Sequence, residues 1–347
     1  MRTLPAVSSL RAAYPGAHLA WLVEPSAATA LEEQPWIDEV LVFPRPKLSA
    51  ALRQRQLEPL LALLGGFVST LRARRFDLVV DFHSLLRSAL LSWVSGARRR
   101  VGLASPFGTE GSWWLAGETA ELEPAKLSRF DRNSGLVEYL GVEAKLAAQP
   151  FAVSPADRAR AEASLAPGRV PVALHPGTSE GTPYKRWRVD GYSELARRLR
   201  DEDGLPSVVT YGPAREDRAL AEAVVEGSDG AARLAPQTLT LRELAALMAS
   251  VRICVGADTG PLHVASLVGT PVVQLLGPTD PVENAPFSST PSRSLRTGIE
   301  CSPCRNGCAA ATCMREIDPE SVLCAVRDLL GGSALPEWTT AVIRGAA

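Results

Sequence analysis

The chain has 347 residues, of which 46% are hydrophobic and 22% are charged, and its formal net charge is −1. This composition is typical of a globular protein that is long enough for two domains. The charge balance argues against nucleic-acid binding, no apolar run reaches the roughly 18 residues of a membrane span, and no signal peptide opens the sequence. We therefore expect a cytoplasmic protein.

Strands and helices alternate along the first half of the chain. This alternation is typical of a parallel sheet with helices on both faces. The expected elements are a helix over residues 2–14, strands over 18–23 and 40–43, a helical stretch over 47–75, a strand over 76–81, a helix over 84–95 and an extended segment over 98–103.

The stretch over residues 47–75 is rich in Leu and Arg. This pattern favours an amphipathic helix that packs one face on the core and exposes a basic face to water. The alternative is a surface that contacts an anionic membrane.

A second alternating series follows a domain boundary that we expect within residues 150–167. Four loops at strand ends carry Gly, Pro and polar residues, and they should meet at one edge if the sheet is parallel. These loops are 175–179, 212–216, 258–263 and 277–281. The expected strands are 170–174, 207–211, 251–255 and 271–276, and the expected helices are 155–165, 189–202, 214–226, 240–250 and 323–330.

The most informative loop is Asp258 to His263, with the sequence Asp-Thr-Gly-Pro-Leu-His between a strand and a helix. Free N–H groups and the positive helix end there favour an anion, which suggests a nucleotide or a nucleotide-sugar. Asp and Thr could instead simply cap the helix. Asp-Thr-Gly also occurs in aspartic proteases, but those need a second Asp on a β-rich scaffold.

Four of the six cysteines form a cluster, with two, three and four residues between them. A zinc or iron–sulfur centre is one interpretation of such a cluster. The irregular spacing favours a thiol-rich structural loop, so we expect no bound metal. The cysteines concerned are Cys301, Cys304, Cys308 and Cys313.

The strand-end motifs together resemble glycosyltransferase family 9, the ADP-heptose:lipopolysaccharide heptosyltransferases. Weaker support comes from residues 76–81 with Arg87-Ser88, and from the cysteine segment. The strong motifs are Leu174-His175-Pro176-Gly177-Thr178, Lys185-Arg186-Trp187, the run 258–263 and Gly277-Pro278-Thr279-Asp280-Pro281.

The resemblance implies an α/β protein with the GT-B fold, in which two Rossmann-like doubly wound domains face a cleft. Residues 1–155 would be the acceptor-binding domain, 165–330 the donor-binding domain, and 331–347 a C-terminal tail. Sugar would be transferred from a nucleotide donor with inversion, and neither a metal nor another cofactor would be needed.

The resemblance also implies roles for individual residues. Lys185 would stabilise charge on the departing diphosphate and Asp258 would hold sugar hydroxyls, which makes these two the catalytic candidates. Glu216 would contact the ribose, whereas His175 would be structural. The expected donor-binding set is Thr178, Ser179, Lys185, Glu216, Asp258, Thr259, Gly260, Pro261, Leu262 and His263.

The start of the chain departs from the family pattern. Family members open with an apolar strand and a Gly-Asp loop that carries the proposed base, whereas this sequence opens with Met1-Arg2-Thr3-Leu4-Pro5-Ala6. We therefore expect that strand, and the base that an inverting transfer needs, to lie before Met1.

The sequence thus predicts transfer of a sugar, heptose from ADP-heptose, onto a lipopolysaccharide core acceptor. The alternative is a catalytically impaired protein that binds a nucleotide-sugar but lacks the base. A third possibility is a metal-thiolate or redox module on the cysteine cluster. The expected partners are the donor and a lipid-linked oligosaccharide, with peripheral contact at the cytoplasmic face of the inner membrane and no nucleic acid.

Overall fold

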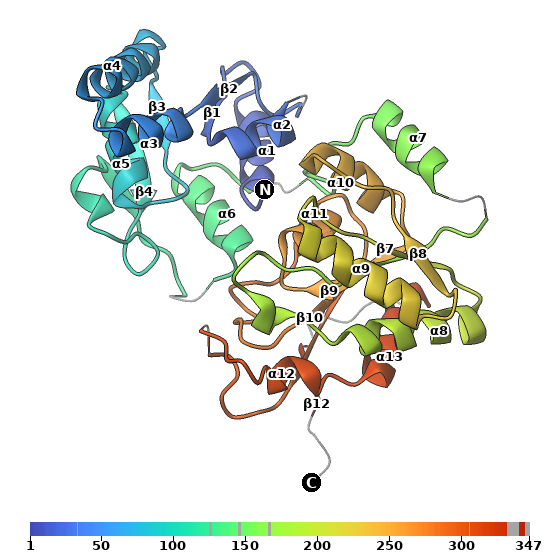
Figure 1. The fold of residues 1–347 in the computed structure, drawn as a ribbon. Helices are drawn as coiled ribbons and strands as arrows, with labels where there is room; N and C mark the ends of the chain where they lie inside the picture. The colour runs from blue at the N-terminus through green and yellow to red at the C-terminus, as the bar shows by residue number, and fades with distance from the viewer. Residues whose placement is uncertain are drawn as a thin grey trace. The chain divides into compact units, whose positions relative to one another are not determined.

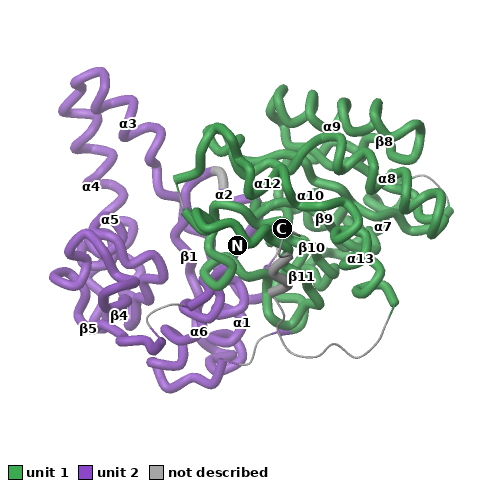
Figure 2. The backbone as a smooth tube through the Cα atoms, turned by 90° about the horizontal axis from the view of Figure 1, so that it is seen from below, with its two compact units in different colours: residues 1, 148–347 green, residues 2–147 purple. Residues whose placement is uncertain are grey.

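The chain divides into two compact units, residues 2–147 and residues 148–347 together with Met1 (Figure 2). The structure is a computed structural model that describes all residues except 33, 125–126, 145–146, 166–167, 305, 332–339 and 344–347; the side chains of 26 and 340–343 are also not described. The division falls before the expected boundary, because residues 148–164 pack on the second unit. Phe151 N donates to Leu267 O at 3.3 Å, and Arg158 Nη1 donates to Ala249 O at 2.9 Å.

The second unit is built on one parallel sheet of seven described strands (Figure 1). The strands lie in the order β12-β11-β10-β9-β6-β7-β8. From the adjacent pair β6 and β9, later strands are added outward on opposite sides, so this pair is the topological switch point. Ligands bind beside such a switch point in doubly wound sheets. The strands are β6 (Val172–His175), β7 (Ser207–Val209), β8 (Ala232–Leu234), β9 (Ile253–Ala257), β10 (Val272–Leu275), β11 (Ser292–Thr297) and β12 (Thr340–Ile343). Part of the expected C-terminal tail is thus a strand, and its other residues beyond Gly331 lie outside the described part.

One large hydrophobic core joins this sheet to its helices α8, α9 and α13. Each strand residue of β6 and β9 is buried, as the uninterrupted apolar runs predict. The helices of the unit are α7 (Pro155–Ser164), α8 (Val189–Asp203), α9 (Arg215–Gly227), α10 (Leu241–Ala249), α11 (Gly260–Leu267), α12 (Thr312–Arg315) and α13 (Pro319–Leu330).

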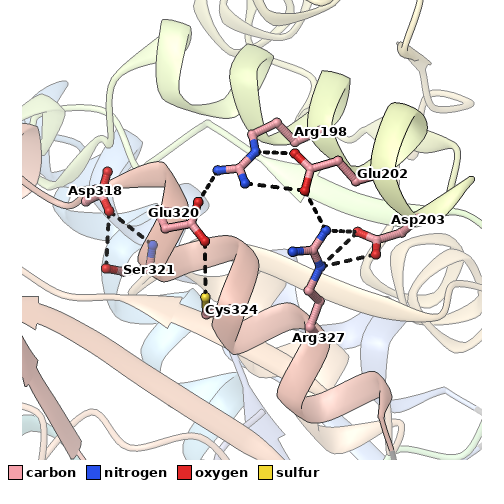
Figure 3. Close-up of polar contacts among 8 residues, drawn as sticks. All are labelled: Arg198, Glu202, Asp203, Asp318, Glu320, Ser321, Cys324 and Arg327. Atoms are coloured by element: carbon pink, nitrogen blue, oxygen red, sulfur yellow. Dashed lines mark hydrogen bonds and ion pairs between the residues drawn. The ribbon is translucent and has the colours of Figure 1, made fainter.

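Ion pairs on the surface join α8 to α13 (Figure 3). Arg198 of α8 pairs with Glu202 at 2.6 Å and also with Glu320 of α13. Arg327 of α13 pairs in turn with two acidic residues of α8, with Nη2 2.8 Å from Glu202 and 3.0 Å from Asp203. Both helices thus pack their apolar faces on the sheet, and ion pairs join their charged faces.

The described residues of the first unit form two separate parallel sheets. β1 (Ala20–Val23) pairs with β2 (Glu39–Val42), and the other sheet has the order β3-β4-β5. The three hydrophobic clusters described within this unit are small, with three or four buried residues each. The remaining elements are α1 (Leu4–Ala13), α2 (Pro25–Leu31), α3 (Arg45–Arg53), α4 (Leu57–Ala73), β3 (Leu78–Val80), α5 (Leu86–Val94), β4 (Arg99–Leu103), the 3₁₀ turn η1 (Ser112–Trp114), β5 (Glu118–Ala120) and α6 (Arg129–Tyr139).

The helical stretch expected over residues 47–75 is two helices, α3 and α4. The chain turns between them at Arg55, whose φ of 54° is left-handed and cannot continue a helix. Phe67 and Leu71 in the second half of α4 are buried with Leu41. Among the described residues, no helix has the length and apolar character that crossing a membrane requires.

Candidate functional site

The predicted loops meet at the switch point of the seven-stranded sheet. β6 and β9 are hydrogen-bonded neighbours, with His175 opposite Gly256, so the loops that follow them begin side by side. β7 lies on the other side of β6, and β10 on the other side of β9. All four predicted loops therefore leave the same edge of the sheet, because parallel strands end there together.

The centre of this edge is a buried charged cluster. Lys185 Nζ lies 3.3 Å from Asp258 Oδ2, and His263 Nε2 lies 3.1 Å from Asp258 Oδ1. The side chains of Asp258 and His263 are 6% and 4% exposed, whereas that of Lys185 is 21% exposed. Lys185 is therefore the member of the cluster that is most accessible to water and to a ligand.

Lys185 is positioned by the aromatic residue two places later. It ends the 3₁₀ turn η2 (Pro183–Lys185), and Trp187 then enters the core with 2% exposure. Trp187 Nε1 donates to Ile317 O at 2.9 Å, and its ring stacks edge-on against Tyr192 with 4.8 Å between centroids. The backbone of Lys185 is thus held in place, while its flexible side chain can still change direction.

The N-terminus of α11 opens beside this cluster. The hydroxyl of Thr259 donates to Ala257 O at 3.3 Å and makes no side-chain cap, so it leaves the first N–H groups of the helix to other partners. A Cβ added to Gly260 would meet no atom within 4 Å, which leaves the approach open. Pro261 occupies the first turn, where its missing N–H costs nothing.

The side chain of Leu262 is fully buried, and a Cβ added to Gly256 of β9 would lie 3.8 Å from its Cδ1. Leu262 thus packs α11 on the sheet. Its membership of the donor-binding set stays a prediction.

Arg186 ties two of the loops together. The sequence placed it in the motif Lys185-Arg186-Trp187 but assigned it no role. Its Nε donates to Thr178 Oγ1 at 3.1 Å and its Nη1 to Glu216 Oε1 at 2.7 Å. This pairing lowers the pKa of the Glu216 carboxyl. Glu216 remains 61% exposed and can still accept from hydroxyls, and Ser179 is exposed beside Thr178.

Asp217 is a second residue that the sequence did not indicate. A Cβ at Gly177 would lie 3.0 Å from Asp217 Oδ1, and one at Gly212 only 2.7 Å from Oδ2. The carboxylate thus fills the space that two glycines leave between the β6 and β7 loops. Desolvation raises the pKa of Asp217. The two glycines were the available signal, since close packing by a neighbour is one reason for Gly in a loop.

His175 is structural, as expected. It is 4% exposed, its Nδ1 lies 2.9 Å from Thr210 Oγ1, and its carbonyl accepts from Tyr192 Oη at 3.0 Å. Burial lowers the pKa of His175 to about 4, so the ring is neutral at pH 7. It therefore joins β6 to β7 without adding charge.

The cysteine segment packs against the loop after β10. Ser302 Oγ donates to Gly277 O at 2.7 Å and Cys304 N to Pro278 O at 3.1 Å. A Cβ at Gly277 would lie 2.7 Å from Cys313 Sγ, and burial raises the pKa of that thiol. Within the described ranges, no three His, Cys, Asp or Glu side chains are placed to hold a metal ion. The absence of a bound metal stays a prediction.

Comparison with known proteins assigns the family. The profile of glycosyltransferase family 9 (heptosyltransferase) matches residues 65–314. The chain belongs to this family. Lipopolysaccharide heptosyltransferase 1 of Pseudomonas aeruginosa is 30% identical over 88% of this chain and 82% of its own length. The lipopolysaccharide core heptosyltransferase OpsX of Haemophilus influenzae is 23% identical over 63% of this chain, and the match spans 62% of that relative.

A solved structure supports the fold. The E. coli heptosyltransferase with ADP aligns with a TM-score of 0.73 at 20% identity, over 94% of this chain and 95% of that one. The chain is thus a glycosyltransferase with the GT-B fold, and the resemblance found in its motifs is confirmed.

Proposed function

We propose that this family 9 glycosyltransferase moves heptose from ADP-heptose, with inversion, onto a lipopolysaccharide core acceptor. The observation that carries the proposal is the meeting of Lys185, Asp258 and the open N-terminus of α11 at the sheet's switch point. The names of the relatives, which are lipopolysaccharide heptosyltransferases, support the choice of sugar and acceptor.

The charges of the site fit a diphosphate leaving group. The N–H groups of Thr259 and Gly260 and the positive end of α11 would bind phosphate oxygens. Lys185 would turn from Asp258 toward the negative charge that develops as the glycosidic bond breaks. Asp258 would then accept from the sugar hydroxyls, and Glu216 from those of the ribose.

Protein groups alone would supply this stabilisation, so the proposal includes no metal. We further propose that the protein works on the cytoplasmic side of the inner membrane, where a lipid-linked acceptor would be presented. The alternative of a binding protein without transfer gains no support from the relatives, which are named as transferases.

Substitution of the charged cluster tests the proposal. We expect Asp258→Asn and Lys185→Ala each to lower heptose transfer by about 10²-fold or more, the usual loss for one preorganised electrostatic group. Transfer from ADP-heptose to a truncated core acceptor would be followed by mass spectrometry, with and without EDTA. Glu222→Gln is the control, because among the described residues Glu222 forms its ion pair with exposed Arg218 on the same helix, α9.

Three outcomes would count against the proposal. Near-wild-type turnover by both site variants would remove the assigned roles of Lys185 and Asp258. Tight binding of ADP-heptose by the wild-type protein, measured by calorimetry, without transfer to any core acceptor would favour the binding-protein alternative. Loss of transfer in EDTA would contradict the metal-free chemistry.

A further inference from the structure

Exposed apolar side chains are concentrated in the first unit. Among the described residues, 12 of the 15 large hydrophobic side chains with high exposure lie before residue 148. Isolated exposed apolar residues are ordinary, but a cluster of them marks a surface that contacts something. The 12 are Tyr14, Val42, Leu52, Leu57, Leu61, Leu64, Leu86, Leu90, Trp93, Trp113, Trp114 and Tyr139, and the other three are Val170, Leu239 and Val282.

The clearest row lies on the first half of α4. Leu57, Leu61 and Leu64 are 69%, 67% and 38% exposed, and their spacing of four and three residues puts them on one helix face. Residues 57–71 carry a single charge, at Glu58. Leu52 at the end of α3, 64% exposed, adds to the same end of the α3–α4 hairpin.

This row is held away from the unit's core. The second half of α4 is anchored by Phe67 and Leu71, which are 9% and 3% exposed. The first half has no fully buried residue. Figure 2 shows the α3–α4 hairpin extending outward beyond β4, β5 and α6. Leu57 and Leu61 therefore leave most of their side-chain surface uncovered.

Two basic side chains, Arg53 and Arg55, lie at the turn that precedes the row. Arg45 pairs with Glu24 and Arg74 with Glu39, whereas Arg53 and Arg55 at the turn are exposed and have no ion pair within the described part of the chain. Residues 45–75 hold one acidic side chain, Glu58, against seven basic ones: Arg45, Lys47, Arg53, Arg55, Arg72, Arg74 and Arg75. The chain as a whole has a formal net charge of −1, so this excess is local.

We propose that the tip of the α3–α4 hairpin docks on an anionic lipid bilayer. Its leucines would enter the boundary between headgroups and acyl chains, while Arg53 and Arg55 would meet lipid phosphates. A second copy of the chain is the less favourable occupant, because two such tips would bring like charges together. The contact is interfacial, since α4 has 17 residues and no described helix has the length and apolar character of a membrane span.

Vesicle flotation tests this docking without any sugar acceptor, so the result does not depend on the proposed reaction. We expect the full chain to float with phosphatidylglycerol/phosphatidylethanolamine vesicles. The triple variant Leu57→Ser, Leu61→Ser, Leu64→Ser should bind at least about tenfold more weakly, given the apolar area removed. Leu239→Ser is the matched control, because Leu239 is 70% exposed in the second unit.

The charge contribution is separated by a second variant. Arg53→Gln with Arg55→Gln should weaken binding to the anionic vesicles and make the remainder less sensitive to salt. Equal binding to pure phosphatidylcholine, or equal flotation of the triple variant and the wild type, would overturn the proposal. Sedimentation velocity without lipid gives the other decisive result: a dimer that the triple variant abolishes would assign the row to a second copy instead.

Discussion

The two units of this protein differ in how completely they bury their apolar residues. The second unit buries every strand residue of β6 and β9 and joins them to three helices in one core. In the first unit, every residue of β1 and β3 is only half-buried, and the clusters are small. The comparison teaches that a site requiring fixed charges lies on the well-packed unit, while the less packed unit presents an exposed apolar surface.

The physical reason lies in the sheets. In the seven-stranded sheet, β6 and β9 are paired on both sides, which fixes the loops that follow them. Among the described residues, β1 pairs only with β2, and β3 only with β4. Strands paired on one side hold their loops less firmly. The precision of the Lys185–Asp258 contact thus depends on the sheet beneath it.

Truncation of one buried and one exposed leucine tests this difference in packing between the two units. Leu195 on α8 is fully buried, and Leu61 on α4 is 67% exposed. We expect Leu195→Ala to lower the free energy of unfolding by about 2–5 kcal/mol through lost burial and a cavity. Leu61→Ala should change it by no more than about 0.5 kcal/mol.

Urea unfolding followed by circular dichroism measures both variants. Since the chain has two units, the transition that responds to Leu195→Ala should be the one that also responds to a ligand of the second unit. Equal losses for the two leucines would mean that α4 is packed in solution and that its exposed row does not exist.

Much of the site was predictable from sequence, because its signals are local. A buried strand followed by Asp-Thr-Gly predicts a helix start. Four loops that follow parallel strands of one sheet must also lie at the same edge of that sheet. The structure has that edge, and the contact of Lys185 with Asp258 joins two of the motifs across 73 residues. Element positions agree within a few residues wherever apolar runs are uninterrupted, as at β9 and β10.

What the sequence did not indicate depends on non-local packing. Arg186 belongs to a recognised motif, but its role was not predicted, because that role arises from the distance between Thr178 and Glu216 in the folded unit. The break between α3 and α4 was also missed, since no Gly or Pro marks the left-handed residue Arg55. Short strands such as β5 and β8 carry too few residues for a period to show.

A finer test of how the second unit holds its loops is the contact of Arg186 with both the β6 and the β7 loops. We expect Arg186→Ala to raise KM for the nucleotide-sugar donor by about tenfold, since it removes two bonds that hold the β6 and β7 loops together. The turnover number should change less, because Arg186 supports the donor loops and does not touch the reacting atoms. Steady-state kinetics at varied donor concentration separates the two effects.

Arg188→Ala provides the control. In the described part of the chain, Arg188 forms its ion pair with exposed Asp190 at 2.5 Å, so its removal should leave KM unchanged. An Arg186→Ala enzyme with wild-type KM but a much lower turnover number would show that this arginine acts on the leaving group directly. That result would move Arg186 from the supporting residues to the catalytic ones.

The smallest expected effect concerns the ion pairs between α8 and α13. Hydrogen bonds from Arg198 and Arg327 lower the pKa of Glu202 to about 2, from an ordinary value of 4.5. A carboxyl whose pKa is depressed on folding stabilises the protein above its unfolded pKa, and that contribution is lost as the pH falls through the folded value. The Tm difference between wild type and Glu202→Gln should therefore be constant above about pH 5.5 and shrink between pH 4.5 and 2.

The difference should stay below about 4 °C, because the carboxyl is exposed to solvent, and 0.5 M NaCl should reduce it further. Calorimetric melting at a series of pH values measures it, with Glu226→Gln, an exposed glutamate on α9, as the control. A difference that grew on acidification would show that Glu202 binds a proton more tightly in the folded state than in the unfolded one. The pairs would then not hold α13 to α8, and the packed core beneath them alone would account for the stability of the second unit.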